Sequence, residues 1–217
     1  MGLYVNGSMV SSNSVSLGYS DTNIPFSIGA LHRGTFSTTV SYFTGDIDDV
    51  RIHSRALSEA EIQELYNDDS GDTGLVAHFP FNGNADDESG SGYDGTVVGA
   101  TLTSDRFGNA DSAYHFDGDD YITCGDVLDM QNSSWTYALW VRASSFDQYA
   151  KLINKGQTTY GTPSNSGFSL RLLGGSLSTK ELWFSANDDD GDQGVVAIGF
   201  SQLPTNEYVF LAGVYDR

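Results

Sequence analysis

A strand joined to a short capped helix, over residues 43–66, is the feature that most constrains the fold of this chain. The stretch reads FTGDIDDVRIHSRALSEAEIQELY, and the alternation around Val50 and Ile52 predicts a β-strand. Ser58, followed three residues later by Glu61, has the pattern of a capping box and predicts where the helix begins. A helix of about ten residues is not stable alone in water. Its apolar face must therefore pack on another part of the chain, and that face consists of Ile62, Leu65 and Tyr66.

Short apolar runs separated by turn residues recur along the rest of the 217 residues. Asn6-Gly7 follows the first run and is a strong hairpin signal. The runs at 135–142 (WTYALWVR) and 208–215 (YVFLAGVY) predict strands, and we expect Trp135 and Trp140 to lie in the core. Many strands with one helix predict an all-β chain, folded as an antiparallel two-sheet sandwich.

The formal net charge of −19 limits the partners of the chain. Nucleic acid and anionic membranes attract basic surfaces, so neither is expected as a partner, and no apolar run is long enough to insert into a bilayer. Aspartates gather in loops with Gly and Asn, which suits oxygen ligation of a hard cation. The alternative is a solvated acidic surface. A single cysteine, Cys124, excludes an internal disulfide.

Two parts of the chain resemble one known module in reversed order. The motifs LVAHFPFNGNADDESGSGYDGTVVGATLTSDRFGNADSAYHFDGDDYI, WTYALWVR and YVFLAGVYDR lie in residues 75–217, and LYVNGS and GDIDDVRIHSRALSEAEIQELYN lie in residues 3–67. The first set resembles the opening two-thirds, and the second set the last third, of a bacterial laminin-G-like module. The resemblance implies a concanavalin A-like jelly roll with a circularly permuted order.

This order predicts one domain over residues 1–217. Residues 1–67 would supply the closing strands and helix, 68–74 the linker and 75–217 the opening two-thirds. Two architectures are consistent with it. The chain closes on itself as a circular permutant, which we favour because the ends of a domain are commonly neighbours. Alternatively, each part completes a neighbouring copy by strand exchange.

The resemblance also implies one structural calcium ion, held where the first and last strands of the module meet. The implied carboxylates are Asp48 on the closing strand and Asp87 in the loop after the opening strand, with Asn84 beside it. Members of the family often carry Asn or His near positions 91 and 93, where this chain has Ser and Tyr, and Asp94 is the substitute ligand. The alternative is that these side chains cap turns through Asx hydrogen bonds.

Catalysis finds little support in the sequence. Glucanases of this fold carry Glu-x-Asp-x-x-Glu on one strand, and that pattern is absent, as is any Ser/His/Asp constellation. We therefore expect no enzyme. Sugar rings stack on aromatic side chains, and sugar hydroxyl groups pair with Asp and Asn. The candidate ligand-binding residues are Tyr149, Tyr160, Trp183 and Asn187, although ordinary packing explains each of them as well.

The resulting hypothesis is a non-catalytic, calcium-stabilised, lectin-like module of a larger secreted or cell-surface protein, with a glycan or a cell-surface protein as its partner. The alternative is a structural or adhesion repeat that binds protein or itself, without glycan binding. A degenerate glycosidase is a third and less favoured reading.

Overall fold

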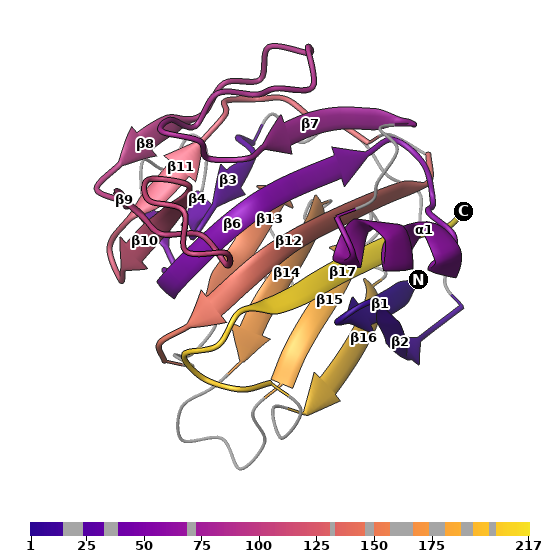
Figure 1. Ribbon diagram of the computed structural model, residues 1–217. Coiled ribbons are helices and arrows are strands. Elements are labelled where there is room, and N and C mark those ends of the chain that lie inside the picture. The colour runs from indigo at the N-terminus through magenta and orange to yellow at the C-terminus, as the bar shows by residue number, and fades with distance from the viewer. Residues whose placement is uncertain are drawn as a thin grey trace.

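The computed structural model describes residues 1–14, 24–32, 39–68, 73–130, 133–145, 150–156, 167–173, 181–187, 193–199 and 203–217. Two antiparallel sheets pack face to face in it, and a single helix lies outside them in the described part of the chain (Figure 1). This is the two-sheet jelly-roll sandwich that the strand pattern predicts. The described residues include no helix with the length and apolarity that a membrane crossing requires.

The first sheet has eight strands, and β6 lies in its middle. One edge of β6 pairs with β12, and its other edge is shared by β10 and β7. The strands in spatial order are β2 (Ser8–Ser12), β1 (Gly2–Val5), β17 (Val209–Tyr215), β12 (Trp135–Ala143), β6 (Thr44–His53), β10 (Ala113–Asp117) and β9 (Thr101–Thr103), with β7 (Leu75–Phe79) beside β6.

The second sheet has seven strands and faces the first across the core. Its spatial order is β16 (Gln193–Gly199), β15 (Glu181–Asn187), β14 (Gly167–Leu173), β13 (Lys151–Gly156), β3 (Ser27–Ile28), β11 (Tyr121–Thr123) and β8 (Thr96–Val98). A short ladder of β4 (Leu31–His32) and β5 (Thr39–Val40) was not predicted, because the sequence there is polar and contains glycine.

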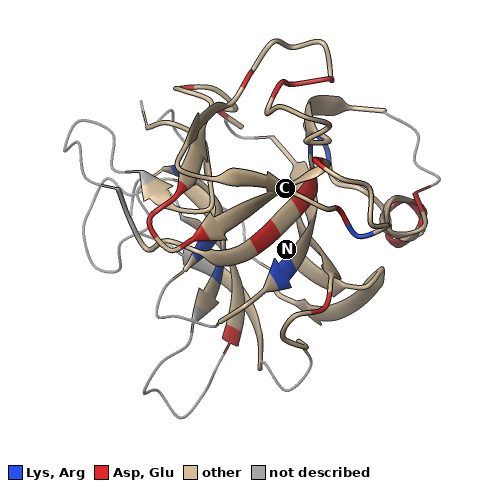
Figure 2. Cartoon of the chain, turned by 60° about the vertical axis from the view of Figure 1, so that its left-hand side comes forward, with Lys and Arg blue, Asp and Glu red and all other residues tan. Residues whose placement is uncertain are grey.

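The front and back portions of the chain interleave in both sheets. β1 pairs with β17, so that Gly2 lies opposite Val214, and the N and C labels lie close together in Figures 1 and 2. Asn6 and Gly7 form the two-residue turn between β1 and β2, both with positive φ, as a hairpin of this length requires. The first strand of the chain therefore lies beside its last, where the reversed order requires them to meet.

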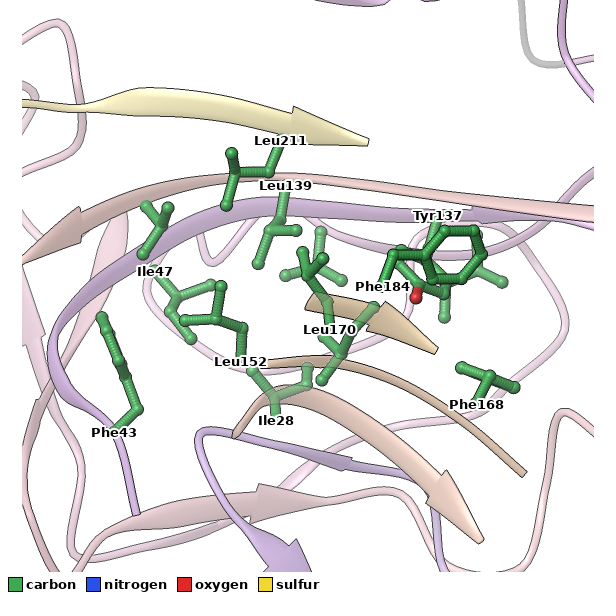
Figure 3. Close-up of a cluster of buried hydrophobic side chains, with 14 of the residues drawn as sticks. Ile28, Phe43, Ile47, Tyr137, Leu139, Leu152, Phe168, Leu170, Phe184 and Leu211 are labelled. Atoms are coloured by element: carbon green, nitrogen blue, oxygen red, sulfur yellow. The ribbon is translucent and has the colours of Figure 1, made fainter. Parts of the chain in front are cut away.

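The core lies between the sheets and is built from alternating inward side chains. Leu139 and Leu211 of the first sheet face Leu152 and Leu170 of the second, and all four are fully buried (Figure 3). Trp135 is buried in this core as predicted. The prediction for Trp140 was wrong: it lies on the outer face of the first sheet. The reason is parity, since residues five apart on a regular strand point to opposite faces.

The helix α1 (Glu59–Tyr66) covers part of that outer face. Its buried Ile62 and Leu65 form a second apolar cluster with side chains from β1, β12 and β17. The ring of Tyr66 stacks on Trp140 with ring centroids 5.5 Å apart. The capping box is present as predicted, because Ser58 accepts from the backbone N–H of Glu61 and the Glu61 side chain accepts from that of Ser58.

Candidate metal and ligand sites

A β-bulge in β6 brings two neighbouring carboxylates to the same side of the sheet. Asp48 pairs with Trp140 and Arg51 with Ala138, so two residues of β6 stand opposite one residue of β12. Asp49 is the residue that adopts the left-handed backbone, with φ 50°. The inserted residue keeps the flanking Ile47 and Val50 in the core while both acids face outward.

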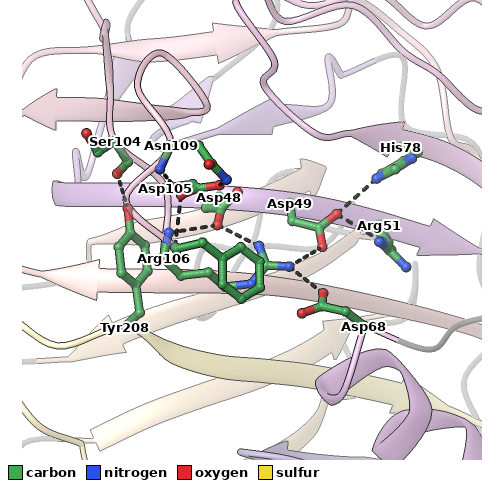
Figure 4. A network of polar contacts seen from close by, with 11 residues as sticks. Asp48, Asp49, Arg51, Asp68, His78, Ser104, Asp105, Arg106, Asn109 and Tyr208 are labelled. Carbon is green, nitrogen blue, oxygen red and sulfur yellow. Dashed lines mark hydrogen bonds and ion pairs between the residues drawn. The ribbon is translucent and has the colours of Figure 1, made fainter.

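The guanidinium of Arg106 meets both acids (Figure 4). Nη1 lies 2.6 Å from Oδ2 of Asp48, and Nη2 lies 3.3 Å from Oδ2 of Asp49. Nη2 also contacts Asp68, just beyond the end of α1. The side chain of Arg106 is 9% exposed, and its Cζ lies 4.5 Å from the ring centroid of Phe107 and 4.9 Å from that of Trp140.

The two neighbouring carboxyl groups respond in opposite directions. Burial raises the pKa of Asp48 to about 6, although the charge of Arg106 acts against that shift. Burial acts on Asp49 in the same sense, but hydrogen bonds from His78 and Arg51, together with the charges of Arg51 and Arg106, lower its pKa to about 2. Asp49, which has more cationic and hydrogen-bonding partners, thus has a lowered pKa, whereas Asp48, with Arg106 as its partner, has a raised pKa.

Asp87, the predicted ligand in the loop after β7, is saturated by donors of its own loop and strand. Oδ1 accepts from the backbone N–H groups of His78 and Ser89 at 2.9 and 3.0 Å. Oδ2 accepts from the N–H of Tyr93 and the hydroxyl of Ser89, both at 3.0 Å. A carboxylate offers about four acceptor positions, so these bonds use all of them. The pKa of Asp87 is lowered by these bonds against the effect of burial.

The other predicted ligands are also engaged locally. Oδ1 of Asn84 accepts from the N–H of Asp86 at 3.1 Å, and Oδ1 of Asp94 accepts from the N–H of Asp87 at 3.0 Å. Asp48 is bonded to Arg106 instead. The structure therefore does not gather the predicted set into one cage of oxygens, and these residues do not fit a calcium ion as they stand. Loop N–H groups require acceptors, and the Asx-turn alternative describes what these side chains do.

One other group of acids offers a better arrangement for a cation. In the part of the chain that the structure describes, only Asp117, Asp119 and Asp120 bring three potential ligand atoms within 4.8 Å of one another. Gly118 between them has φ 111°, which lets the loop turn sharply. The pKa of Asp119 is raised by its hydrogen bond to Asp117 and by the negative charge of that neighbour.

The structure describes only some of the predicted ligand-binding residues. Tyr149 and Tyr160 lie outside the described residues, and for Asn187 only its backbone, at the end of β15, is described. Trp183 lies on the outer face of the seven-stranded sheet, because its neighbours Leu182 and Phe184 are buried in the core. Its Nε1 donates to Glu181 at 2.6 Å, and the guanidinium carbon of Arg171 lies 4.8 Å from its ring centroid.

Sequence reasoning missed Arg106 and Phe107, which lie in a turn between β9 and β10. Asp105 builds that turn by accepting the N–H groups of Phe107 and Asn109 at 2.9 and 2.8 Å. The turn presents Phe107 to solvent at 66% exposure, the highest value among the large hydrophobic side chains that the structure describes. The available signal was the pattern Asp-Arg-Phe-Gly-Asn, a tight turn that carries an aromatic residue at its tip.

Comparison with protein families agrees with this architecture. The family model described as the concanavalin A-like lectin/glucanases superfamily matches residues 1–63 and 116–217. The chain belongs to the concanavalin A-like lectin/glucanase superfamily. The split match is consistent with the permuted order of this superfamily member. Searches of the curated proteins and of the solved structures found no match.

Membership in this superfamily supports a carbohydrate-binding type of module. The match covers β1, β6, β12 and β17 of the first sheet. It also covers β14 and β15 of the second sheet, which carry Arg171 and Trp183. Arg106 and the Asp87 loop lie between the two matched stretches. The superfamily comprises glucanases as well as lectins. The strand β15 carries one glutamate, Glu181, and its side chain accepts a hydrogen bond from Trp183.

Proposed function

We propose that the chain is a non-catalytic carbohydrate-binding module that acts outside the cell, in a secreted or cell-surface protein, and that its partner is a glycan. The superfamily match over residues 1–63 and 116–217 is the observation that carries this proposal. The acidic surface, with a net charge of −19 and red segments spread over many loops in Figure 2, favours neutral glycans over anionic ones.

Trp183 is the residue on which we propose that the sugar stacks. Its ring lies on the outer face of the second sheet, is partly exposed and is oriented by Glu181 and Arg171. An aromatic ring fixed in this way offers a flat apolar surface to the C–H face of a sugar at small cost in side-chain entropy. Glu181 and Arg171, the partly exposed polar neighbours that contact this ring, supply hydrogen-bond partners for hydroxyl groups.

A glycan array probed with the purified chain tests the proposal. We expect binding to one class of neutral glycan and its loss in Trp183→Ala, as measured by the array and by titration calorimetry. Phe107→Ala is the matched control, because it removes an exposed aromatic ring from the loop over the other sheet. Absence of binding to every glycan would favour the alternative of an adhesion repeat, and release of reducing ends from β-glucans would overturn the non-catalytic assignment.

Calcium is the second part of the proposal, as a structural cofactor of the loop between β10 and β11. The three oxygens of Asp117, Asp119 and Asp120 support it, and backbone carbonyls and water would complete the six to eight ligands that calcium requires. A ligand that binds only the folded chain must raise its melting temperature. We expect a higher melting temperature in calcium than in chelator, and no such difference in Asp119→Asn. Equal melting temperatures of the unmodified chain would contradict a calcium cofactor.

A further inference from the structure

Lys155 is a lysine of strand β13 that points into the sandwich. It pairs with Phe168 of β14, which faces the core (Figure 3), and its own side chain is 0% exposed. Its nitrogen Nζ lies 2.7 Å from Oδ1 of Asp126 and 2.8 Å from Oδ1 of Asp129, both in the loop between β11 and β12. We propose that Nζ of Lys155 condenses with the carboxyl group of Asp129 to an amide bond, and that Asp126 transfers the protons.

The two carboxyl groups meet the nitrogen in different ways. Oδ1 of Asp126 accepts a hydrogen bond from Nζ, and this side chain is 41% exposed. Oδ1 of Asp129 is buried and has no hydrogen-bond donor, although Nζ is 2.8 Å away, because the two groups are not aligned as donor and acceptor. A buried polar atom without a hydrogen bond is rare and calls for an explanation. Asp126 is therefore placed to accept a proton from Nζ, and Asp129 to be attacked by it.

The reaction needs no group from outside the protein. Asp126 takes a proton from the ammonium group, and the free amine attacks Cγ of Asp129, so that a C–N bond forms. One C–O bond of Asp129 then breaks, and its oxygen leaves as water with the two protons that Nζ loses through Asp126. One ammonium and one carboxylate become one amide and one water, nothing is oxidised or reduced, and Asp126 regains its charge.

The structure holds the reacting groups in contact from both sides. The strand β13 is fixed between β14 and β3, and the loop is anchored by Leu128 and Met130, which are buried in the core. Groups that are held in this way react as if at an effective concentration of about 10⁵ M or more. The amide also replaces a fully buried cation and its carboxylate by a neutral group, which removes the cost of their desolvation. Both terms favour the amide over the ion pair.

Mass spectrometry of the purified chain tests the proposal. We expect an intact mass lower than that of the sequence by one water, about 18 Da. Trypsin does not cleave after an acylated lysine, so the digest should contain a branched peptide in which residues 107–142 are joined to 152–171, with the bond at Asp129. Cleavage after Lys151 is the internal control, because this second buried lysine contacts the hydroxyl group of Ser169 at 3.0 Å.

Three variants separate the roles of the residues. Lys155→Arg keeps a cation but lacks the amine, and Asp129→Ala lacks the carboxyl group, so both should keep the full mass of their sequence. Asp126→Asn should form the bond at least about 100-fold more slowly, as expected for loss of proton transfer.

The proposal is overturned if the unmodified chain keeps its full mass after prolonged incubation at neutral pH, or if a water is lost without a branched peptide. A bond at Asp126 instead of Asp129 would overturn the assignment of the two acids. The peptide map of the unmodified chain gives these answers even if a variant does not fold. None of them depends on glycan binding, since Trp183 lies on the opposite face of the second sheet.

Discussion

Asp48 and Asp49 are adjacent in the sequence, and their carboxyl groups show how strongly local partners govern a buried charge. Asp48 is held by Arg106 alone among the described residues and keeps a raised pKa of about 6. Asp49 is bonded to Arg51, His78 and Arg106, and its pKa is lowered to about 2. One bulged residue in β6 thus separates a carboxylate that destabilises the fold from one that stabilises it.

These two shifts predict opposite effects of pH on stability. Between about pH 2 and 4 the unfolded chain holds more protons on Asp49 than the folded chain does, so stability rises with pH. Between about pH 4 and 6 the folded chain holds more protons on Asp48, so that contribution falls as pH increases. The stabilisation by Asp49 is therefore present above pH 4 and is lost toward pH 2.

We expect Asp49→Asn to lower the free energy of unfolding at pH 5 by about 2 kcal/mol and to remove the rise between pH 2 and 4. Asp48→Asn should remove the fall between pH 4 and 6. Urea unfolding over this pH range measures both, and the difference from the unmodified chain isolates each group. A curve for Asp49→Asn that runs parallel to that of the unmodified chain would contradict the assignment.

The sequence predicted the importance of Asp48 but not its partner. Arg106 is distant in the chain, and nothing in the turn Asp-Arg-Phe-Gly-Asn indicates that its cation reaches β6. The prediction for Asp87 identified the right loop, but composition does not tell whether an aspartate binds metal or caps backbone N–H groups. That choice depends on loop geometry, which three-dimensional packing sets.

The elements of the fold were more predictable than the site. The strand β6, the capping box of α1 and the hairpin at Asn6-Gly7 all follow from local patterns, and the structure confirms them. The short strands β4, β5 and β9 were missed, because pairing with neighbours rather than their own composition defines them. Trp140 was assigned to the wrong face because hydrophobicity alone was considered and its distance from Trp135 was not.

The cap of α1 provides a test for one element. Ser58→Ala removes the acceptor for the backbone N–H of Glu61, and such caps contribute about 1 kcal/mol. Because α1 packs on the outer face of the first sheet, the free energy of unfolding of the entire chain should fall by this amount. Urea denaturation should show this decrease, with Ser8→Ala on the exposed edge strand β2 as a control that changes little. Equal effects of the two variants would argue against a stabilising cap.

The pairing of β1 with β17 joins the first and last strands of the chain in the eight-stranded sheet. Gly2 lies opposite Val214, so residues 215–217 and 1 would form a four-residue loop if the ends were joined. That length is within the usual range for antiparallel hairpins. The same set of contacts is therefore available to a chain in which the two portions follow each other in the opposite order.

We expect a reordered chain, residues 75–217 followed by 1–67, to fold and to melt within a few degrees of the original. A chain reopened between Asp49 and Val50 is the control that should fail, because it divides the central strand β6. Melting temperature and mass in solution are the measurements. A monomeric mass supports closure within one chain, whereas a reordered chain that forms a ladder of oligomers would indicate that strands are exchanged between copies.

The position of β6 also affects how the protein is made. This central strand is synthesised before β7, β10 and β12, which pair with it, and β1 is synthesised before its partner β17. A nascent chain therefore holds unpaired apolar strands from residues 1–67 until the strands of residues 75–217 have emerged. Such exposure invites aggregation and slows folding. Ribosome-associated chaperones should consequently matter more for this protein than for a relative in which the same strands emerge in the usual order.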